Sequence, residues 1–308
     1  MKTFPVVLFV YNRLMHTVQT IEALQKNYGA SDSILYIYSD GPRNQEDEQG
    51  VAAVRRYVKD VTGFADVIIV EREQNLGLAG SLISGITEVL DSNESIIVLE
   101  DDLITSPFFL QFMNDALKFY EFEEQVAAIH GYFFPLQTDF PDTFLMRFTG
   151  CWGWGTWKRG WSLFEPDGNK LLKQIIDAGL TKKFDMNGAY PYTQMLEKQV
   201  KGKVNSWAIR WYASIFLSGK LNLYPGESLV KNIGHDGSGE HSFKSDLYDV
   251  CLSNSNVKVS PIMISEDIQL VSRLESYFKN GHSGLINFWI WKLFGRQPFI
   301  QHATKVIK

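Results

Sequence analysis

Three adjacent acids, Glu100, Asp101 and Asp102, follow directly on the apolar run Ile96–Leu99. Neighbouring carboxylates repel one another, so this arrangement indicates either a solvated turn or a site that holds a positive group. Carboxylate oxygens suit a hard divalent cation such as Mg²⁺ or Mn²⁺, which usually takes its remaining ligands from water and from the phosphates of a substrate. The triplet therefore predicts a divalent cation that bridges a strand end to a bound diphosphate.

An arginine, an aspartate and a glycine-containing turn follow three other apolar stretches and suit the same ligand. Arg13 either pairs with phosphate oxygens through its planar guanidinium or caps the start of a helix. Asp40 either accepts hydrogen bonds from a nucleobase or a ribose, or forms an Asx turn ahead of Pro42. The turn NLGLAGS, Asn75–Ser81, presents backbone N–H groups at a helix start, where anions bind.

Several classes of function are disfavoured by what the sequence lacks. The first predicted strand–helix turn carries no G-x-G-x-x-G fingerprint, which disfavours a nicotinamide enzyme, and the absence of a Walker A motif disfavours a P-loop NTPase. The formal net charge is −5 and no block of like charge occurs, which argues against a nucleic-acid polymer as partner.

Buried strands alternating with amphipathic helices must position these residues. Apolar runs recur about every 30 residues, the span of one βα unit, at Val6–Val10, Ile34–Tyr38, Val67–Val70 and Ile96–Leu99. Helical apolar spacing lies between them, in Thr17–Leu24, Glu46–Val58 and Leu78–Leu90. This alternation predicts an α/β fold with a mainly parallel central sheet flanked by helices. Because ligands of such sheets bind outside the carboxyl ends of the strands, we expect the four strand exits to line one crevice.

The composition is that of a globular chain with a sizeable core: 308 residues, 45% of them hydrophobic and 21% charged. Two cysteines, Cys151 and Cys251, show neither metal spacing nor a disulfide framework, which favours a reducing compartment. The apolar run near the N-terminus is too short for a signal peptide, and no stretch reaches the roughly 18 apolar residues of a transmembrane helix. We therefore expect a cytoplasmic protein.

The second half of the chain differs from the first in composition and shows a weaker apolar periodicity. Tryptophan and glycine are dense in GCWGWGTWKRGW, residues 150–161, and helical stretches follow at Leu171–Leu180 and Trp207–Leu217. A strand-like stretch then ends near Val230 and leads into a glycine-rich loop. No linker rich in proline, serine or charge separates the halves, so we expect one compact unit with two lobes.

The last stretch, residues 277–308, contains no acid and carries five lysines and arginines around the apolar segment LINFWIWKLF. A basic, aromatic segment of this kind suits a membrane-surface anchor, which would place the protein on the inner face of the plasma membrane. The alternative is a C-terminal helix that docks on the core or in a dimer.

Six segments, in the order PVVLFVYNR, YSDG, NLGLAGS, IIVLEDDL, GWGTW and NIGHDGSGEH, resemble a GT-A glycosyltransferase. More narrowly, they resemble bacterial family-2-type sugar transferases related to the eukaryotic β-1,2-N-acetylglucosaminyltransferase of N-glycan branching. The resemblance covers roughly residues 4–245. It implies a nucleotide-diphospho-sugar transferase fold with an acceptor lobe, a nucleotide-diphosphate sugar as donor, and usually Mn²⁺.

The resemblance also implies a division of the chain. Residues 1–245 would form the catalytic domain, with a nucleotide-sugar-binding half at 1–125 and an acceptor half with a closing loop at 126–245. Residues 246–308 would form a helical, basic and aromatic extension.

Roles follow residue by residue from the same resemblance. Asp102 would bind the metal, which would be Mn²⁺ or Mg²⁺, Asp101 would face the ribose and Glu100 the donor sugar. The other donor-site residues would be Arg13 at the diphosphate, Asp40 at the uracil edge of a UDP donor, Asn75 and Gly77 at the helix start, and His235 or His241 at the diphosphate or the metal. Trp152, Trp154 and Trp157 would either stack on acceptor sugars or pack between the lobes.

The catalytic base departs from the family pattern. Related enzymes place an aspartate just after a tryptophan at the start of a second-lobe helix, and the matching position here is Ala208, after Trp207. The candidate replacements are Asp236 and Glu240 in the closing loop, and Glu165 and Asp167 after the tryptophan cluster, with Asp236 preferred. The implied mechanism is inversion by direct displacement, with a carboxylate taking the proton from the acceptor hydroxyl.

The leading hypothesis is a metal-dependent hexosyl- or N-acetylhexosaminyltransferase that acts on a glycan or lipid-linked acceptor in bacterial surface polysaccharide synthesis. A sugar-nucleotide pyrophosphorylase shares a similar nucleotide fold, but its glycine-rich basic loop is missing from YNRLMHT. A third hypothesis is a protein that binds sugar nucleotides without transferring them, which the alanine at 208 favours.

Overall fold

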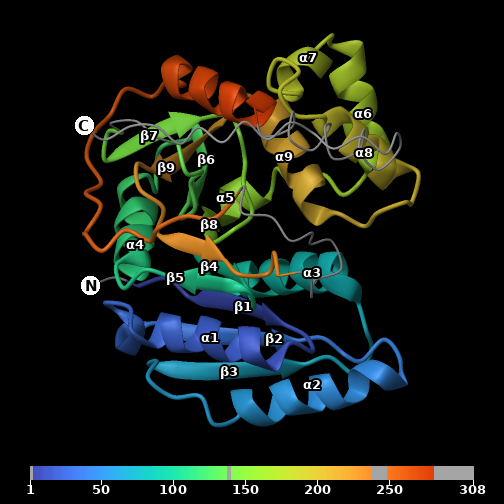
Figure 1. The fold of residues 1–308 in the computed structure, drawn as a ribbon, viewed down its shortest axis with the longest axis vertical. Helices are drawn as coiled ribbons and strands as arrows, with labels where there is room; N and C mark the ends of the chain where they lie inside the picture. Colours follow the sequence, from blue (N-terminus) through green and yellow to red (C-terminus); the bar gives the residue numbers. More distant parts are fainter. Residues whose placement is uncertain (1–2, 137–139, 237–247, 281–308) are drawn as a thin grey trace, which may run out of the picture.

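The computed structural model describes residues 3–136, 140–236 and 248–280, and is a mixed α/β fold with helices on both faces of a large sheet (Figure 1). Its strands are β1 Val6–Val10, β2 Ile34–Ser39, β3 Asp66–Glu71, β4 Ser95–Glu100, β5 Leu103–Thr105, β6 Val126–His130, β7 Thr143–Met146, β8 Trp154–Trp157, β9 Leu221–Pro225 and β10 Val230–Asn232. Its helices are α1 Leu14–Gln25, α2 Gln45–Val58, α3 Gly77–Ser92, α4 Phe109–Phe119, α5 Lys158–Trp161, α6 Gly168–Asp177, α7 Thr181–Phe184, α8 Tyr192–Val200 and α9 Trp207–Ser218, with a short 3₁₀ turn η1 at Ala30–Asp32.

The first four strands of the sheet are parallel, in the order β3-β2-β1-β4. Each agrees with a predicted apolar run to within one residue at either end. Every residue of β1 is buried, and its side chains alternate between two cores: Val6, Leu8 and Val10 face one, Val7 and Phe9 the other. Polar side chains in a strand buried on both faces would lose their contact with water, which explains why such a run is continuously apolar.

The connecting helices of this half also lie where they were predicted. The Asn44 side chain accepts a hydrogen bond from the Asp47 amide and so caps α2. Acids in the first turn of α2, and Arg55 and Arg56 in its last, match the helix dipole. Apolar residues of α1 and α2 belong to one core and those of α3 to the other, so the helices cover both faces of the sheet.

Beyond β4 the sheet is mixed, in the order β4-β8-β6-β9-β7. Strand β8 runs antiparallel to β4 and β6, and β7 antiparallel to β9, whereas β6 and β9 are parallel. The expected parallel arrangement is therefore continuous over the first four strands, and beyond them the antiparallel strands β8 and β7 interrupt it. Strands from residues 1–125 and 126–245 pair in this sheet through β4 and β8, and the domain division stays a prediction.

A second, two-stranded antiparallel sheet brings the chain back to the acid triplet. Strand β10 pairs with β5, with Asn232 opposite Leu103. Because β5 begins one residue after Asp102, this pairing delivers residues 233–236 beside the triplet. The Ile233 amide donates to the Asp102 carbonyl at 2.9 Å. Residues 237–247, the rest of the predicted closing loop, lie outside the described residues.

The described chain ends in a helix at residues 268–280, drawn in red in Figure 1. Its apolar residues Leu270, Leu274 and Phe278 belong to the same core as α1 and α4. Among the residues that the structure describes, no helix is both long and apolar enough to cross a bilayer. The predicted membrane-surface segment falls mostly on residues 281–308, outside the described part of the chain.

Candidate functional site

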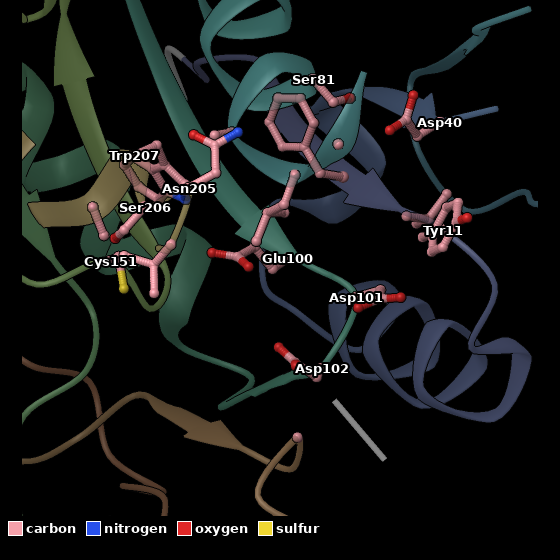
Figure 2. A pocket seen from close by; sticks show the side chains of 18 of the residues that line it. Tyr11, Asp40, Ser81, Glu100, Asp101, Asp102, Cys151, Asn205, Ser206 and Trp207 are labelled. Carbon is pink, nitrogen blue, oxygen red and sulfur yellow. The ribbon is translucent and has the colours of Figure 1, made fainter. Parts of the chain in front are cut away.

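A cavity of about 900 Å³ opens at the carboxyl ends of β1, β2 and β4, between them and the second half of the chain. Ligand pockets of proteins commonly enclose about 300–1,000 Å³. Figure 2 shows the acid triplet, Tyr11 and Asp40 on one side, with Cys151, Asn205, Ser206 and Trp207 across from them. The lining includes every described residue to which the sequence assigned a donor or metal role: Arg13, Asp40, Asn75, Gly77, Glu100, Asp101, Asp102 and His235.

The acid triplet shares one arginine. The Nη2 group of Arg13, the residue before α1, donates to Asp101 Oδ1 and, at 2.7 Å, to Asp102 Oδ2. Even with this partner, burial and the charges of Asp102 and Asp101 raise the pKa of Glu100 to about 8. Burial likewise raises the pKa of Asp101 to about 6, against the opposing charge of Arg13. One guanidinium therefore does not offset the negative charge gathered at the end of β4.

Two atoms beside the triplet lack hydrogen-bond partners among the described residues: Asp101 Oδ2 and His235 Nε2, both buried. Burial lowers the pKa of His235, although Asp102 opposes the shift, so its imidazole is neutral and can coordinate. Residue 234 is a glycine because an added Cβ would collide with Asp102 Oδ2. The loop after β10 is thus seated directly on the triplet.

This set of donors fits a divalent cation. Carboxylate oxygen with imidazole nitrogen is a set that Mn²⁺ accepts, and the excess negative charge favours a cation. Within the described residues, no group of three or more His, Cys, Asp and Glu side chains forms a metal cage. Asp102 with His235 would therefore be a partial set, as expected of a cation that also takes ligands from water and phosphate.

Asp40 is held between the ends of β2 and the start of α3. Its Oδ1 accepts hydrogen bonds from the Gly41 and Leu76 amides, both at 3.0 Å. The Asn75 side chain donates to the Gly41 carbonyl at 2.7 Å, which joins the second strand exit to the NLGLAGS turn. These bonds do not form the Asx turn given as the alternative, because such a turn reaches the amide two residues on and Pro42 has no N–H. The Asp40 carboxylate lines the cavity.

Arg55 of α2 holds the residues around Asp40 in place. Its guanidinium donates to the carbonyls of Ser39, Asp40 and Arg72, at 3.4, 3.3 and 2.6 Å, and so joins the ends of β2 and β3. The sequence placed Arg55 only in a helix, and nothing in the spacing shows that it reaches two strand ends.

Tyr11 and Asn12, at the exit of β1, also line the cavity and were not assigned a role from the sequence. Asp47 of α2 accepts from the Tyr11 hydroxyl at 2.8 Å and from the Asn12 amide at 2.7 Å. The Arg43 amide donates to the Tyr11 hydroxyl at 3.0 Å. Their position, directly before Arg13 at a strand exit, is the signal by which they could have been found.

The far wall comes from the segment between α8 and α9. Gln199, Lys203, Asn205, Ser206 and Ala208 line the cavity there. The alanine at the position where the family pattern places a base thus lines the cavity, and among the described residues this wall carries no carboxylate in its place. The sequence identified only Ala208 on this wall, because the other residues belong to no motif.

The tryptophan cluster divides between cavity and core. Trp152 lines the cavity and makes an edge contact with His235, their ring centroids 5.4 Å apart. Trp154 and Trp157 are 0% and 3% exposed and belong to the two cores on opposite faces of β8. Trp154 stacks on Trp207 of α9, and neither face is left for a sugar. For these two indoles the packing alternative is correct and the acceptor-binding expectation is wrong.

The candidate bases are dispersed. Asp236 pairs with His16 Nε2 at 3.3 Å and is not part of the cavity lining. Glu165 pairs with Lys170 at 2.5 Å, and Asp167 caps α6, so both have structural partners away from the cavity. Like Asp236, neither lines the cavity, and a role as base stays a prediction for both. Glu240, like His241, lies outside the described residues.

Comparisons with known proteins leave the family open. No protein-family model matches the chain, and no curated protein matches it in sequence. Among solved structures, the crystal structure of S. aureus TarS matches with a TM-score of 0.31 and 15% identity, over 46% of this chain and 23% of that chain. The chain thus spans less than a quarter of TarS, and a superposition this loose supports no functional assignment.

Proposed function

We propose that this protein is a glycosyltransferase that takes a sugar from a nucleotide-diphosphate donor, with UDP as the favoured nucleotide. The observation that carries the proposal is the cavity at the carboxyl ends of β1, β2 and β4. It gathers an arginine, an acid triplet, a buried aspartate and a helix start in one place. In parallel α/β sheets this edge is where nucleotides bind.

Different residues would bind different parts of the donor. Asp40 would accept from the base, Asn75 and Gly77 would line the nucleotide at the start of α3, and Arg13 would bind the diphosphate. Asp101 and Glu100 would hydrogen-bond the ribose and the donor sugar. Asp102 and His235 would hold Mn²⁺ or Mg²⁺, whose charge would stabilise the leaving diphosphate.

Displacement at the anomeric carbon would proceed with inversion, and the acceptor hydroxyl would lose its proton to a carboxylate. Asp236 stays the proposed base, brought toward the cavity only if the loop that carries it moves from His16. A bacterial surface glycan as acceptor, and a site of action at the cytoplasmic side of the membrane, are part of the same proposal.

The second candidate is a protein that binds nucleotide sugars without transferring them, which Ala208 in the cavity wall favours. Incubation with a panel of UDP- and GDP-sugars in Mn²⁺ separates the two. A transferase releases free sugar and nucleotide diphosphate slowly by transfer to water, and a binding protein releases neither. Turnover that requires added pyrophosphate would instead identify a pyrophosphorylase.

A further inference from the structure

The wall of the cavity that faces the acid triplet is fixed by its own hydrogen bonds. The Ser206 amide donates to Gln199 Oε1 at 2.5 Å, and the Ser206 hydroxyl accepts from the Ile209 amide as the N-cap of α9. The segment 201–206, which we name the α8–α9 loop, is therefore held at its end by both helices that flank it.

A buried arginine supports this loop from behind. Arg210, one turn into α9, is 9% exposed and does not line the cavity. Its guanidinium donates to the Ser206 carbonyl at 3.1 Å, the Pro166 carbonyl at 3.3 Å and Asn205 Oδ1 at 3.3 Å. All three partners are neutral oxygens, and burial lowers the pKa of Arg210. Burial of a guanidinium without a carboxylate partner costs desolvation energy. Charge pairing therefore does not explain the position of Arg210.

The contact with Asn205 sets the orientation of an amide. Arginine has five N–H donors and no acceptor, so the amide oxygen of Asn205 must face Arg210. The Asn205 NH₂ group is thereby turned away from the arginine, and Asn205 itself lines the cavity. The arrangement presents a fixed hydrogen-bond donor on the wall that faces the triplet.

The two walls differ in charge. The strand-exit wall carries four carboxylates together with Arg13 and Arg43, whereas the α8–α9 wall offers the neutral groups of Gln199, Asn205 and Ser206 beside the exposed Lys203. Figure 2 shows the Glu100 carboxylate pointing across the cavity toward Ser206 and Cys151. A ligand that lies between the walls is thus met by hydroxyl and amide groups on the far side, which suit sugar hydroxyls.

We propose that the α8–α9 loop binds the acceptor as an uncharged sugar, that the Asn205 NH₂ donates to an oxygen of that sugar, and that Arg210 is the positioning residue that aims this amide. The inference rests on the proposed function and deepens it, because it assigns the acceptor class and the residue that orients it. Asn205 acts on the acceptor and leaves the nucleotide to the opposite wall.

Binding measurements with simple probes test this assignment. Methyl glycosides of glucose, galactose and N-acetylglucosamine are titrated by saturation-transfer NMR in the presence of UDP and Mg²⁺, which avoids paramagnetic broadening. The native protein is expected to bind at least one. Asn205→Asp keeps the oxygen toward Arg210 and removes the donor, and Asn205→Ala removes both. Each should weaken glycoside binding about two- to tenfold, the value of one neutral hydrogen bond, with UDP affinity unchanged by calorimetry.

Arg210→Lys keeps the charge but cannot hold three oxygens at once, and should weaken glycoside binding as the Asn205 variants do. If Arg210 is only structural, the lysine variant unfolds at a lower temperature while its folded form binds glycoside as the native protein does, which overturns the positioning role. Asn169→Asp, at an exposed site on α6, is the matched control and should behave as native.

The outcomes separate the two proposals. Native-like glycoside binding by both Asn205 variants, or no glycoside binding by a native protein that binds UDP, overturns the acceptor assignment alone. Glycoside binding that needs Asn205 in a protein without UDP affinity overturns the proposed function and supports the sugar site.

Discussion

At the scale of single residues, the site depends on one guanidinium facing three carboxylates. Arg13 contacts Asp101 and Asp102, while Glu100 has no arginine of its own among the contacts described. The neighbouring carboxylates repel one another, and a positive ligand would offset that repulsion. Because these carboxylates are buried, their repulsion destabilises the folded protein when no ligand is bound. The same repulsion favours the binding of a cation.

Replacement of Asp102 by alanine is expected to remove metal-dependent nucleotide binding and leave the fold intact. Asp102 lies at a strand exit with its side chain 14% exposed, so the cores on either face of the sheet lose no contact. Calorimetry with UDP and Mn²⁺ should show at least about a tenfold loss of affinity. Asp91→Ala, at an exposed position near the end of α3, is the control. Native affinity in the Asp102 variant would remove this residue from the metal site.

A buried histidine outside the site predicts how stability depends on pH. His130 of β6 is 1% exposed and stacks on Tyr224, and neither ring nitrogen has a hydrogen-bond partner among the described residues. Burial lowers the pKa of His130 to about 3. A histidine in the unfolded chain has a pKa of about 6.5. As the pH falls below that value, His130 becomes protonated in the unfolded chain but stays neutral in the folded one, so the free energy of unfolding decreases.

The His130→Phe variant keeps the ring stack and lacks this proton. Between pH 7 and pH 5 the native protein should lose about 2 kcal/mol of unfolding free energy relative to the variant. Urea unfolding at the two pH values measures the difference. Parallel losses in the two proteins would contradict a neutral, buried His130.

At the scale of elements, the strand exits and the return of β10 assemble the site. The pairing of β10 with β5 is short, yet it seats Gly234 on Asp102 and brings His235 into the cavity. His235 stacks on Tyr248 and meets the edge of Trp152, so aromatic contacts hold it there. Two elements far apart in sequence thus supply the two proposed metal ligands.

Gly234→Ala tests this seating. The added Cβ would collide with Asp102 Oδ2 and push the loop after β10 off the triplet, while the cores stay intact. We expect UDP affinity in Mn²⁺ to fall several-fold, on the order of 1 kcal/mol, with little change in thermal unfolding. Gly150→Ala is a suitable control because its added Cβ meets only ordinary contacts, the nearest at 3.6 Å. Equal affinities in the two variants would show that the loop is not seated on the metal site.

The first half of the fold could be predicted because its central strands, β1 and β4, are buried on both faces. Continuous apolar runs such as Val6–Val10 are a strong signal, and a parallel sheet brings their carboxyl ends together by geometry alone. That is why most residues of the proposed donor site could be named from the sequence.

The second half could not be predicted in the same way. Strand β8 alternates Trp154 and Thr156 on one face with Gly155 and Trp157 on the other, and the glycine admits β8 close to β4, where a Cβ would lie 2.8 Å from the Ile96 carbonyl. Tryptophans interleaved with small residues resemble a binding loop as much as a core strand. The α8–α9 wall was missed because tertiary packing alone brings Asn205 and Ser206 to the cavity.

At the scale of the whole molecule, the cavity lies between the parallel half of one mixed sheet and the second half of the chain. The strand exits of this parallel half line the cavity with charged groups, and the opposite wall carries neutral polar groups together with Lys203. A ligand that touches both walls would couple the halves of the chain. Binding would then raise the stability of the folded state by mass action.

The measurement that tests the central claim most directly is calorimetric titration of the native protein with UDP, with Mn²⁺ and again with EDTA. The account predicts saturable binding of one UDP per chain that depends on the metal and is competed by UDP-sugars. Absence of UDP binding in Mn²⁺, or equal binding in EDTA, would contradict a metal-dependent nucleotide-sugar site at the end of β4.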